Sequence, residues 1–296
     1  MENSSPGRRC AFLTMDSLED FVSDADLAIA PMQALGWVVE KVSWRDTAAD
    51  WDRFDMVYIC TPWDYQDAPD AFLAVLRRID ASSARLVNDL AIVEWNLDKR
   101  YLREIESRGV AIVPSRWHDR FSVAQVDAAF EAFDAGRMVI KPVVGANADH
   151  TYVLERPLEP GLQAQLEQSF SERPHFIQPF IDAVVTEGEY SLFFFGGEYS
   201  HAILKTPASG DFRTQEEHGS NIQPVTPPAG LVDTARAALA QVEPAPVYAR
   251  ADFVRDTGDV FRVMELELIE PSLYFRTDTD SAARFAAALD QAGRQP

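Results

Sequence analysis

Apolar and polar residues follow two patterns along the first third of the chain. Short, nearly continuous apolar runs, which are typical of strands buried in a parallel sheet, occupy residues 8–15, 37–44, 55–63 and 84–88. Apolar residues at helical spacing lie between them, at residues 24–35 and 68–80. Strands that alternate with helices predict a parallel α/β unit, which we place at residues 1–95.

The remaining sequence predicts two α+β units. The first is placed at residues 96–177. Helices are expected at 95–109, 123–134 and 160–172, and strands at 110–115, 137–144 and 175–181. The second, at 178–296, contains two hairpins and a closing helix, at 187–205, 247–268 and 281–292. The pair Gly196-Gly197 at the centre of the first hairpin is a strong turn signal.

Composition and charge exclude several classes of partner. The 296 residues include 27 Lys and Arg against 47 Asp and Glu, a net charge of −20, so a basic face for nucleic acid is not expected. No apolar run is long enough to span a bilayer, and residues 1–15 lack the pattern of a signal peptide. Cys10 and Cys60 fall in apolar runs and are expected to be buried free thiols. We therefore expect a cytoplasmic protein without nucleic-acid or membrane partners, either monomeric or a homo-oligomer.

The apolar segment 260–275 is unusual because it contains three carboxylates, Glu265, Glu267 and Glu270. Side chains alternate between the two faces of a strand, so Glu265 and Glu267 share one face. The opposite face is expected to point into a core and carries Met264, Leu266 and Leu268.

The preceding strand adds charges to the same patch. A turn at Thr257-Gly258 would set Arg250 opposite Glu265 and Asp252 diagonal to it, roughly 7–8 Å away. Unpaired buried acids are costly, and a divalent cation would remove that cost. Such oxygen ligands suit Mg²⁺, with Mn²⁺ as an alternative. A solvated sheet face with an ordinary salt bridge is the competing explanation.

Two lysines lie in segments that a polyphosphate site could use. Lys141 ends the apolar strand "VIKP", and Lys99 falls in the helical segment "NLDKRYL". Each alone would be interpreted as an exposed side chain. Together they could neutralise one polyphosphate that binds the metal on its far side. Enzymes usually catalyse phosphoryl transfer in this way, by positioning the phosphates and stabilising their charge.

The order of these residues resembles that of the ATP-grasp ligases, in the arrangement of prokaryotic glutathione synthetase, over nearly the whole chain. The resemblance implies an ATP-grasp fold, of mixed α/β and α+β class, with an N-terminal Rossmann-like domain. It implies that Lys99 and Lys141 hold the phosphates of ATP and that Glu189 holds the ribose. A linker strand would supply contacts to adenine from Gln178, Pro179, Phe180 and Ile181.

The same resemblance gives roles to charged residues of the last unit. Asp252, Glu265 and Glu267 occupy the positions of the metal ligands, ahead of Pro271. Three basic residues would stabilise charge on the transferring phosphoryl and acyl groups: Arg213, Arg250 and Lys205.

The chain departs from the family pattern at two places. The phosphate loop "VVGANADHTY" contains only Gly145, and Glu267 stands where an asparagine is usual. These features, with "TPWDY" and "ELELIEPSL", resemble the branch that includes the O-ureido-D-serine cyclo-ligase, which forms D-cycloserine.

The motif "TPWDY" follows the strand at 55–63, at the edge of a parallel sheet where ligands usually lie. Trp63 and Tyr65 would flank a small amino-acid-like substrate, and Asp64 would hold its amine. The alternative is a capped turn with two half-buried aromatic residues. Among the histidines, only His218, beside "HGSN", is a weak candidate for substrate contact.

These observations predict an ADP-forming carboxylate–amine ligase that acts on a small amino-acid-like substrate through an acyl phosphate and could close a ring within that one substrate. An intermolecular dipeptide or glutathione-type ligase is the first alternative. A non-catalytic ATP-binding protein with the same fold is the second. A Rossmann dehydrogenase is disfavoured, because "FLTMDSLED" rather than G-x-G-x-x-G follows the first strand.

Overall fold

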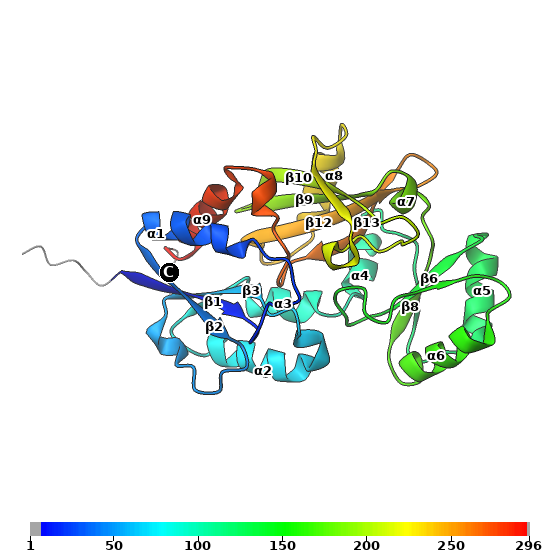
Figure 1. The fold of residues 1–296 in the computed structure, drawn as a ribbon, viewed down its shortest axis with the longest axis horizontal. Coiled ribbons are helices and arrows are strands. Elements are labelled where there is room, and N and C mark those ends of the chain that lie inside the picture. The colour runs from blue at the N-terminus through cyan, green and yellow to red at the C-terminus, as the bar shows by residue number, and fades with distance from the viewer. Residues whose placement is uncertain (1–6, 295–296) are drawn as a thin grey trace, which may run out of the picture.

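The computed structural model describes residues 7–294, which form three sheets with helices packed around them (Figure 1). Residues 1–6 and 295–296 lie outside the described part. The prediction that residues 1–15 contain no signal peptide therefore falls partly outside it. None of the helices within residues 7–294 combines the length and the apolarity needed to cross a bilayer.

The first sheet confirms the predicted parallel α/β unit. Its strands are all parallel and have the order β2-β1-β3-β4: β1 (Arg8–Thr14), β2 (Trp37–Ser43), β3 (Met56–Thr61) and β4 (Arg85–Val87). The helical elements between them are η1 (Ala25–Ala28), α1 (Ile29–Ala34), η2 (Trp51–Arg53), η3 (Tyr65–Asp67) and α2 (Pro69–Asp80). Cys10 and Cys60 are buried free thiols, as expected.

The middle unit is an antiparallel sheet of order β5-β8-β6-β7 covered by two helices. Its elements are β5 (Arg116–His118), α5 (Val123–Phe133), β6 (Met138–Pro142), β7 (Tyr152–Leu154), α6 (Pro160–Phe170) and β8 (His175–Pro179). The proposed boundary between residues 177 and 178 would cut β8. A boundary after Pro179 keeps the strand whole.

The segment before this unit differs from the prediction of one helix at 95–109. It forms two short helices, α3 (Leu90–Asn96) and α4 (Tyr101–Ser107), with Lys99 in the turn between them. At this break the Asn96 side chain is hydrogen-bonded to the backbone of Leu266 and Leu268, and the Lys99 N–H donates to the Val143 carbonyl at 2.8 Å.

The strand predicted at 110–115 is also wrong. Ile112 forms only an isolated bridge to Val263, and the Val113 N–H donates to the Val263 carbonyl at 3.1 Å. The segment therefore lies against the third sheet as a connection, and the strand of the middle sheet begins after it, at Arg116.

The third unit is the predicted antiparallel sheet, with the order β11-β10-β9-β12-β13. Its strands are β9 (Glu189–Phe195), β10 (Glu198–Thr206), β11 (Asn221–Pro224), β12 (Tyr248–Arg255) and β13 (Phe261–Glu267). Its helical elements are α7 (Ala183–Thr186), η4 (Glu216–His218), α8 (Leu231–Leu239), η5 (Phe275–Thr277) and α9 (Ser281–Ala292).

The register of the β12–β13 hairpin differs from the predicted one. Arg250 lies opposite Glu267, and Asp252 lies directly opposite Glu265. The loop is longer than a two-residue turn, because Asp256 N–H donates to the Val260 carbonyl, and a bulge follows between Asp252 and Phe253. The bulge leaves Met264 without a cross-strand partner. Met264 still packs against a small buried cluster of Val113, Val184 and Val254, as predicted, and it also lines the cavity described below.

The first and third units share one hydrophobic core. Side chains of the first sheet pack with those of β9, β12 and α9 in a single buried cluster that includes Phe12, Tyr58, Phe193, Tyr248 and Phe285. Figure 1 shows α9 beside α1, on the first sheet. The middle unit has a separate core between its sheet and its two helices. The two outer units are therefore bound into one body, against which the middle unit lies.

The buried side chain of Asn88, directly after β4, binds the backbone of the third unit by three hydrogen bonds, so we expect a large loss of stability on Asn88→Ala. Its Nδ2 donates to the carbonyls of Tyr248 and Leu268 at 2.9 and 2.8 Å, and its Oδ1 accepts from the Val247 N–H at 2.7 Å. Leaving these groups unpaired should lower the free energy of unfolding by about 2–4 kcal/mol. Denaturant titration measures it, with the exposed Asn221→Ala as the matched control. Equal losses in the two variants would contradict the prediction.

Candidate active site

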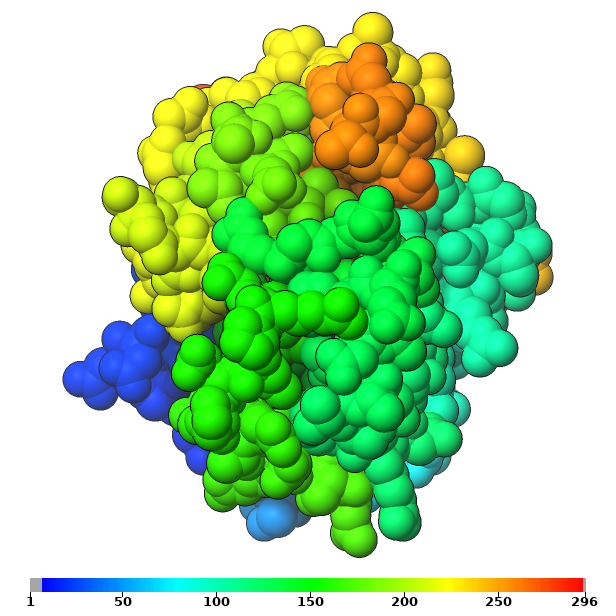
Figure 2. Space-filling view, turned by 90° about the vertical axis from the view of Figure 1, so that its right-hand side faces the viewer, coloured from blue at the N-terminus to red at the C-terminus, as the bar shows by residue number. Residues whose placement is uncertain are grey.

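A large cavity lies where the three units meet. Figure 2 shows this side of the molecule, with the middle unit in green below the orange end of the β12–β13 hairpin. Sequence-predicted residues from all three units line the cavity: Trp63, Tyr65, Lys99, Lys141, Gly145, Gln178, Pro179, Phe180, Ile181, Glu189, Lys205, Arg213, Arg250, Asp252, Glu265 and Glu267. Two predicted residues are not among its lining residues, Asp64 and His218.

Asp252 is the centre of a buried charge network on the third sheet. Arg250 donates to both of its carboxylate oxygens at 3.1 Å, the Lys205 ammonium lies 3.4 Å away, and the Ser191 hydroxyl donates at 2.5 Å. Burial alone would raise the pKa of Asp252, but Arg250 and Lys205 hold that pKa below its usual range. Asp252 is therefore a carboxylate fixed in its charged form.

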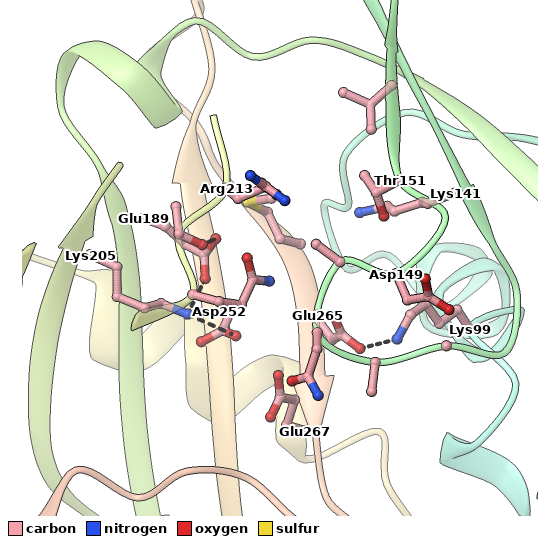
Figure 3. Close-up of a pocket in the computed structure, with 18 of the residues that line it drawn as sticks. Lys99, Lys141, Asp149, Thr151, Glu189, Lys205, Arg213, Asp252, Glu265 and Glu267 are labelled. Carbon is pink, nitrogen blue, oxygen red and sulfur yellow. Dashed lines mark hydrogen bonds and ion pairs between the residues drawn. The ribbon is translucent and has the colours of Figure 1, made fainter. Parts of the chain in front are cut away.

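Glu265 and Glu267 are each held by one cation. Glu265 pairs with Lys99 from the α3–α4 turn (Figure 3), and Glu267 pairs with Arg250. The Glu265 carboxylate outweighs burial and raises the pKa of Lys99. Burial raises the pKa of Glu267 to about 7, against the opposing effect of Arg250.

The three carboxylates have the donor chemistry for a hard divalent cation but are not gathered around one point. Within residues 7–294, no group of three His, Cys, Asp or Glu side chains has a metal-binding arrangement. Asp252 and Glu265 are nevertheless direct cross-strand partners, which places their Cβ atoms about 4.5–5.5 Å apart. The strand positions fit a metal, and the side chains would have to leave Lys99 and Arg250 to coordinate it.

Lys141 is a half-buried cation without a carboxylate partner among the described residues. It lies on β6, its ammonium is 5.2 Å from the centre of the Phe176 ring, and no ion pair joins it to another described residue. Burial lowers the pKa of Lys141, and Glu265 only partly offsets this effect. Figure 3 shows its side chain extending into the cavity across from Arg213. An anion in the cavity would supply the missing charge.

The loop after Lys141 takes unusual backbone conformations despite its single glycine. Asn147, Ala148 and His150 have positive φ values of 52°, 56° and 50°, which glycine would adopt more readily. Gly145 is needed for another reason, since a Cβ there would lie 2.9 Å from Pro142 Cγ. The loop reaches the first unit, where the Asn147 side chain lies 3.5 Å from the Trp63 carbonyl.

Some of the residues expected to bind the adenine and the ribose of ATP already form hydrogen bonds or ion pairs within the protein. The Phe180 N–H donates to the Arg137 carbonyl at 3.0 Å, and the Gln178 side chain donates to Ser115 at 2.9 Å. Glu189 pairs with Lys205 and accepts a hydrogen bond from Thr214 at 2.9 Å. Phe180 and Glu189 still line the cavity, but Glu189 would have to exchange its contact with Lys205 or Thr214 to bind a ribose.

Arg213 lies on the loop between β10 and β11, on the rim of the cavity (Figure 3). The Asp211 carboxylate accepts three hydrogen bonds from the Arg213 guanidinium, two from Nε at 3.1 Å and one from Nη2 at 2.7 Å, and this interaction lowers the pKa of Asp211. The aspartate therefore sets the direction of the guanidinium.

Two of the three predicted residues of the motif "TPWDY" line the cavity, and the third does not. Trp63 and Tyr65 line the cavity at the carboxyl edge of the first sheet, as predicted. The predicted role of Asp64 is wrong, because its carboxylate points away and accepts hydrogen bonds from Trp44 and Arg45 at 2.7 Å. Nor does Asp64 cap the following helical turn. His218 lies on η4, outside the lining of the cavity.

Glu270, for which the sequence predicted no role, lines the cavity together with Trp63 and Tyr65. Burial raises the pKa of Glu270 to about 8, with a further contribution from Glu267. The signal that could have found it was present, since it is the third carboxylate of an apolar segment and directly precedes Pro271.

Comparison with known proteins places this geometry in context. Residues 10–88 match the family described as the N-terminal domain of D-cycloserine synthetase DcsG. The cycloserine biosynthesis protein DcsG of Streptomyces lavendulae is 31% identical over 273 residues, 87% of this chain and 89% of that protein.

Solved structures of related proteins have a similar fold. The crystal structure of D-cycloserine synthetase DcsG has a TM-score of 0.86 at 30% identity, over 97% of this chain and 100% of that one. The ATP-grasp ligase PsnB, solved with a phosphomimetic variant of its minimal precursor, Mg and ADP, has a TM-score of 0.68 at 16% identity, over 98% and 99% of the two chains. The predicted ATP-grasp fold is confirmed.

Proposed function

Because this chain belongs to the D-cycloserine synthetase family of ATP-grasp ligases and is an ATP-dependent carboxylate–amine ligase, we propose that it is a cyclo-ligase for one small amino-acid-like substrate of the O-ureido-D-serine type. Membership of the family confirms the expectation of an enzyme that forms C–N bonds over that of a non-catalytic binding protein. Similarity to D-cycloserine synthetase along 97% of the chain supports the narrower assignment.

The observation that carries the site assignment is the half-buried ammonium of Lys141, which forms no ion pair within residues 7–294. Partial burial of a cation is costly unless an anion joins it, and this one extends into a cavity lined on the other side by further cations (Figure 3). The γ-phosphate of ATP fits between Lys141 and Lys99 on one side and Arg213 on the other. The adenine would then lie along Gln178–Ile181 and the ribose beside Glu189.

The reaction proceeds in two steps. An oxygen of the substrate carboxylate attacks the γ-phosphorus of ATP, ADP departs, and an acyl phosphate remains. The substrate nitrogen then attacks the acyl carbon, and phosphate leaves with the electron pair of the broken C–O bond. Arg213, Arg250 and Lys205 stabilise the charge that develops in these steps.

Asp252, Glu265 and Glu267 would hold Mg²⁺ on the third sheet. When bound, the metal supplies positive charge to the phosphate oxygens. The same binding would release Lys99 from Glu265 and Arg250 from Glu267, so that both cations become available to the substrates.

Ring closure within one molecule fits the shape of the site. The first unit contributes Trp63 and Tyr65 to the same cavity as the phosphate lysines, so one small substrate could contact both. An intramolecular nitrogen needs no second binding site and gains from its effective concentration.

We expect ADP and phosphate, together with a cyclic product, when the protein is incubated with MgATP and O-ureido-D-serine. Mass spectrometry of nucleotides and products tests this against short amino acids and γ-glutamylcysteine. AMP and pyrophosphate would contradict the acyl-phosphate route. ADP formed only after a separate amine is added would favour an intermolecular dipeptide or glutathione-type ligase.

A further inference from the structure

Glu270 is held between the acidic hairpin and the first sheet. Its backbone carbonyl accepts a hydrogen bond from Trp63 Nε1 at 2.8 Å. Its carboxyl group is hydrogen-bonded by the hydroxyl of Tyr65, which follows β3 at the carboxyl edge of the parallel sheet. The first unit therefore fixes the position of a carboxyl group that belongs to the third unit and lines the cavity.

This carboxyl group has no cation of its own. Asp252, Glu265 and Glu267 each form an ion pair, but none joins Glu270 to a basic side chain within residues 7–294. A half-buried carboxyl that faces a substrate cavity without such a partner is suited to a protic or cationic group of the ligand.

Other titratable side chains of the cavity are less suited to take a proton. Burial raises the pKa values of Tyr65 and Tyr274, so both hydroxyls stay neutral. The Asp149 carboxylate lies 3.5 Å from the ring of His150. Glu217 is exposed. Lys141 is the cation assigned to the phosphates.

We propose that Glu270 binds the attacking nitrogen of the substrate and accepts its proton. The nitrogen lone pair forms the C–N bond, the C–O bond of the acyl phosphate breaks, phosphate departs with that electron pair, and the nitrogen's proton passes to the Glu270 carboxylate. This assignment rests on the proposed ligase function and deepens it. The substrate is then an amino-acid derivative whose nucleophilic N–H reaches the edge of the first sheet, beside Tyr65.

Glu270→Gln separates the two halves of the reaction. Formation of the acyl phosphate does not need a base on the nitrogen, so added hydroxylamine should still trap it as a hydroxamate at a rate within a few-fold of wild type. Formation of the C–N product from O-ureido-D-serine should fall by about 10²- to 10⁴-fold. Exposed Glu155→Gln is the matched control, and thermal melting shows that each variant is folded.

The pH dependence supplies a second measurement. The charged and titratable groups that act on Glu270 are Glu265 and Glu267 from β13, Lys99 from the α3–α4 turn, and Tyr65. Because the carboxylate is the active form, the rate of C–N bond formation should rise with pH through about 8. Tyr65→Phe removes a hydrogen bond that lowers the pKa of Glu270, so this rise should move to higher pH. Glu270→Gln should lack it.

Each remaining outcome overturns a defined part of the assignment. Wild-type product formation and an unchanged pH profile in Glu270→Gln would refute the role of Glu270 and leave the ligase function intact. Loss of hydroxamate along with product would show that Glu270 serves the first step or the fold, and would also refute the proposal. A wild-type protein that forms no ADP with any substrate of the panel would refute the proposed function, and this inference with it.

Discussion

Lys141→Met is expected to weaken MgATP binding by about 10- to 100-fold while leaving the protein as stable as the wild type or more so. A lost charge-assisted contact to phosphate corresponds to about 1.5–3 kcal/mol, which gives that range. The stability should not fall, because the variant removes a half-buried cation that forms no ion pair with another described residue and keeps an apolar side chain over Phe176. Calorimetric titration with MgATP and thermal melting measure the two effects.

The prediction is specific because the affinity for MgATP should fall while the thermal stability should not. A residue that serves only the fold would lose stability and affinity together. Lys41→Ala is the control, since that exposed lysine pairs with Asp26 at the edge of the first sheet. An unchanged affinity for MgATP in Lys141→Met would refute the assignment of Lys141 to the phosphates.

Glu265→Gln is expected to lower turnover by on the order of 10²- to 10³-fold with little change in fold. Glu265 shares the cavity side of β13, whereas the apolar contacts of that strand come from Val263 and Leu266 and stay intact. The variant loses a proposed metal ligand and leaves Lys99 without its partner. Circular dichroism should match the wild type, and the rate of ADP formation should fall.

Magnesium dependence distinguishes a metal ligand from a salt-bridge partner. If Glu265 binds the metal, the activity that remains in Glu265→Gln should need a higher Mg²⁺ concentration than the wild type. Glu198→Gln, an exposed carboxylate at the start of β10, should behave as wild type. Near wild-type rates for Glu265→Gln at low Mg²⁺ would identify Glu265 as an ordinary partner of Lys99.

The hairpin shows what could be predicted from the sequence and what could not. Strand alternation correctly put Glu265 and Glu267 on one face, because that rule depends only on local backbone geometry. The pairing between strands depends on loop length and on the bulge opposite Asp252, and neither leaves a clear mark in the sequence. The register was therefore wrong, although the set of charged residues was gathered correctly.

Contacts between separate units also could not be predicted from the sequence. Asp64 was expected to face the substrate because it sits between two aromatic residues that do, but Trp44 and Arg45 turn it away. Glu270 received no role, because its partner Tyr65 is some two hundred residues away in the sequence. Such pairs arise only when separate units pack together, so periodicity within one segment cannot reveal them.

The position of α9 has a consequence for the synthesis of the protein. Phe285 and Leu289 complete the same hydrophobic cluster as Phe12 and Tyr58, which are translated far earlier. At ~5–20 residues per second, the apolar face of the first sheet waits on the order of tens of seconds for its last helix. Until then the nascent chain exposes part of an incomplete core, the kind of surface that makes folding intermediates prone to aggregate.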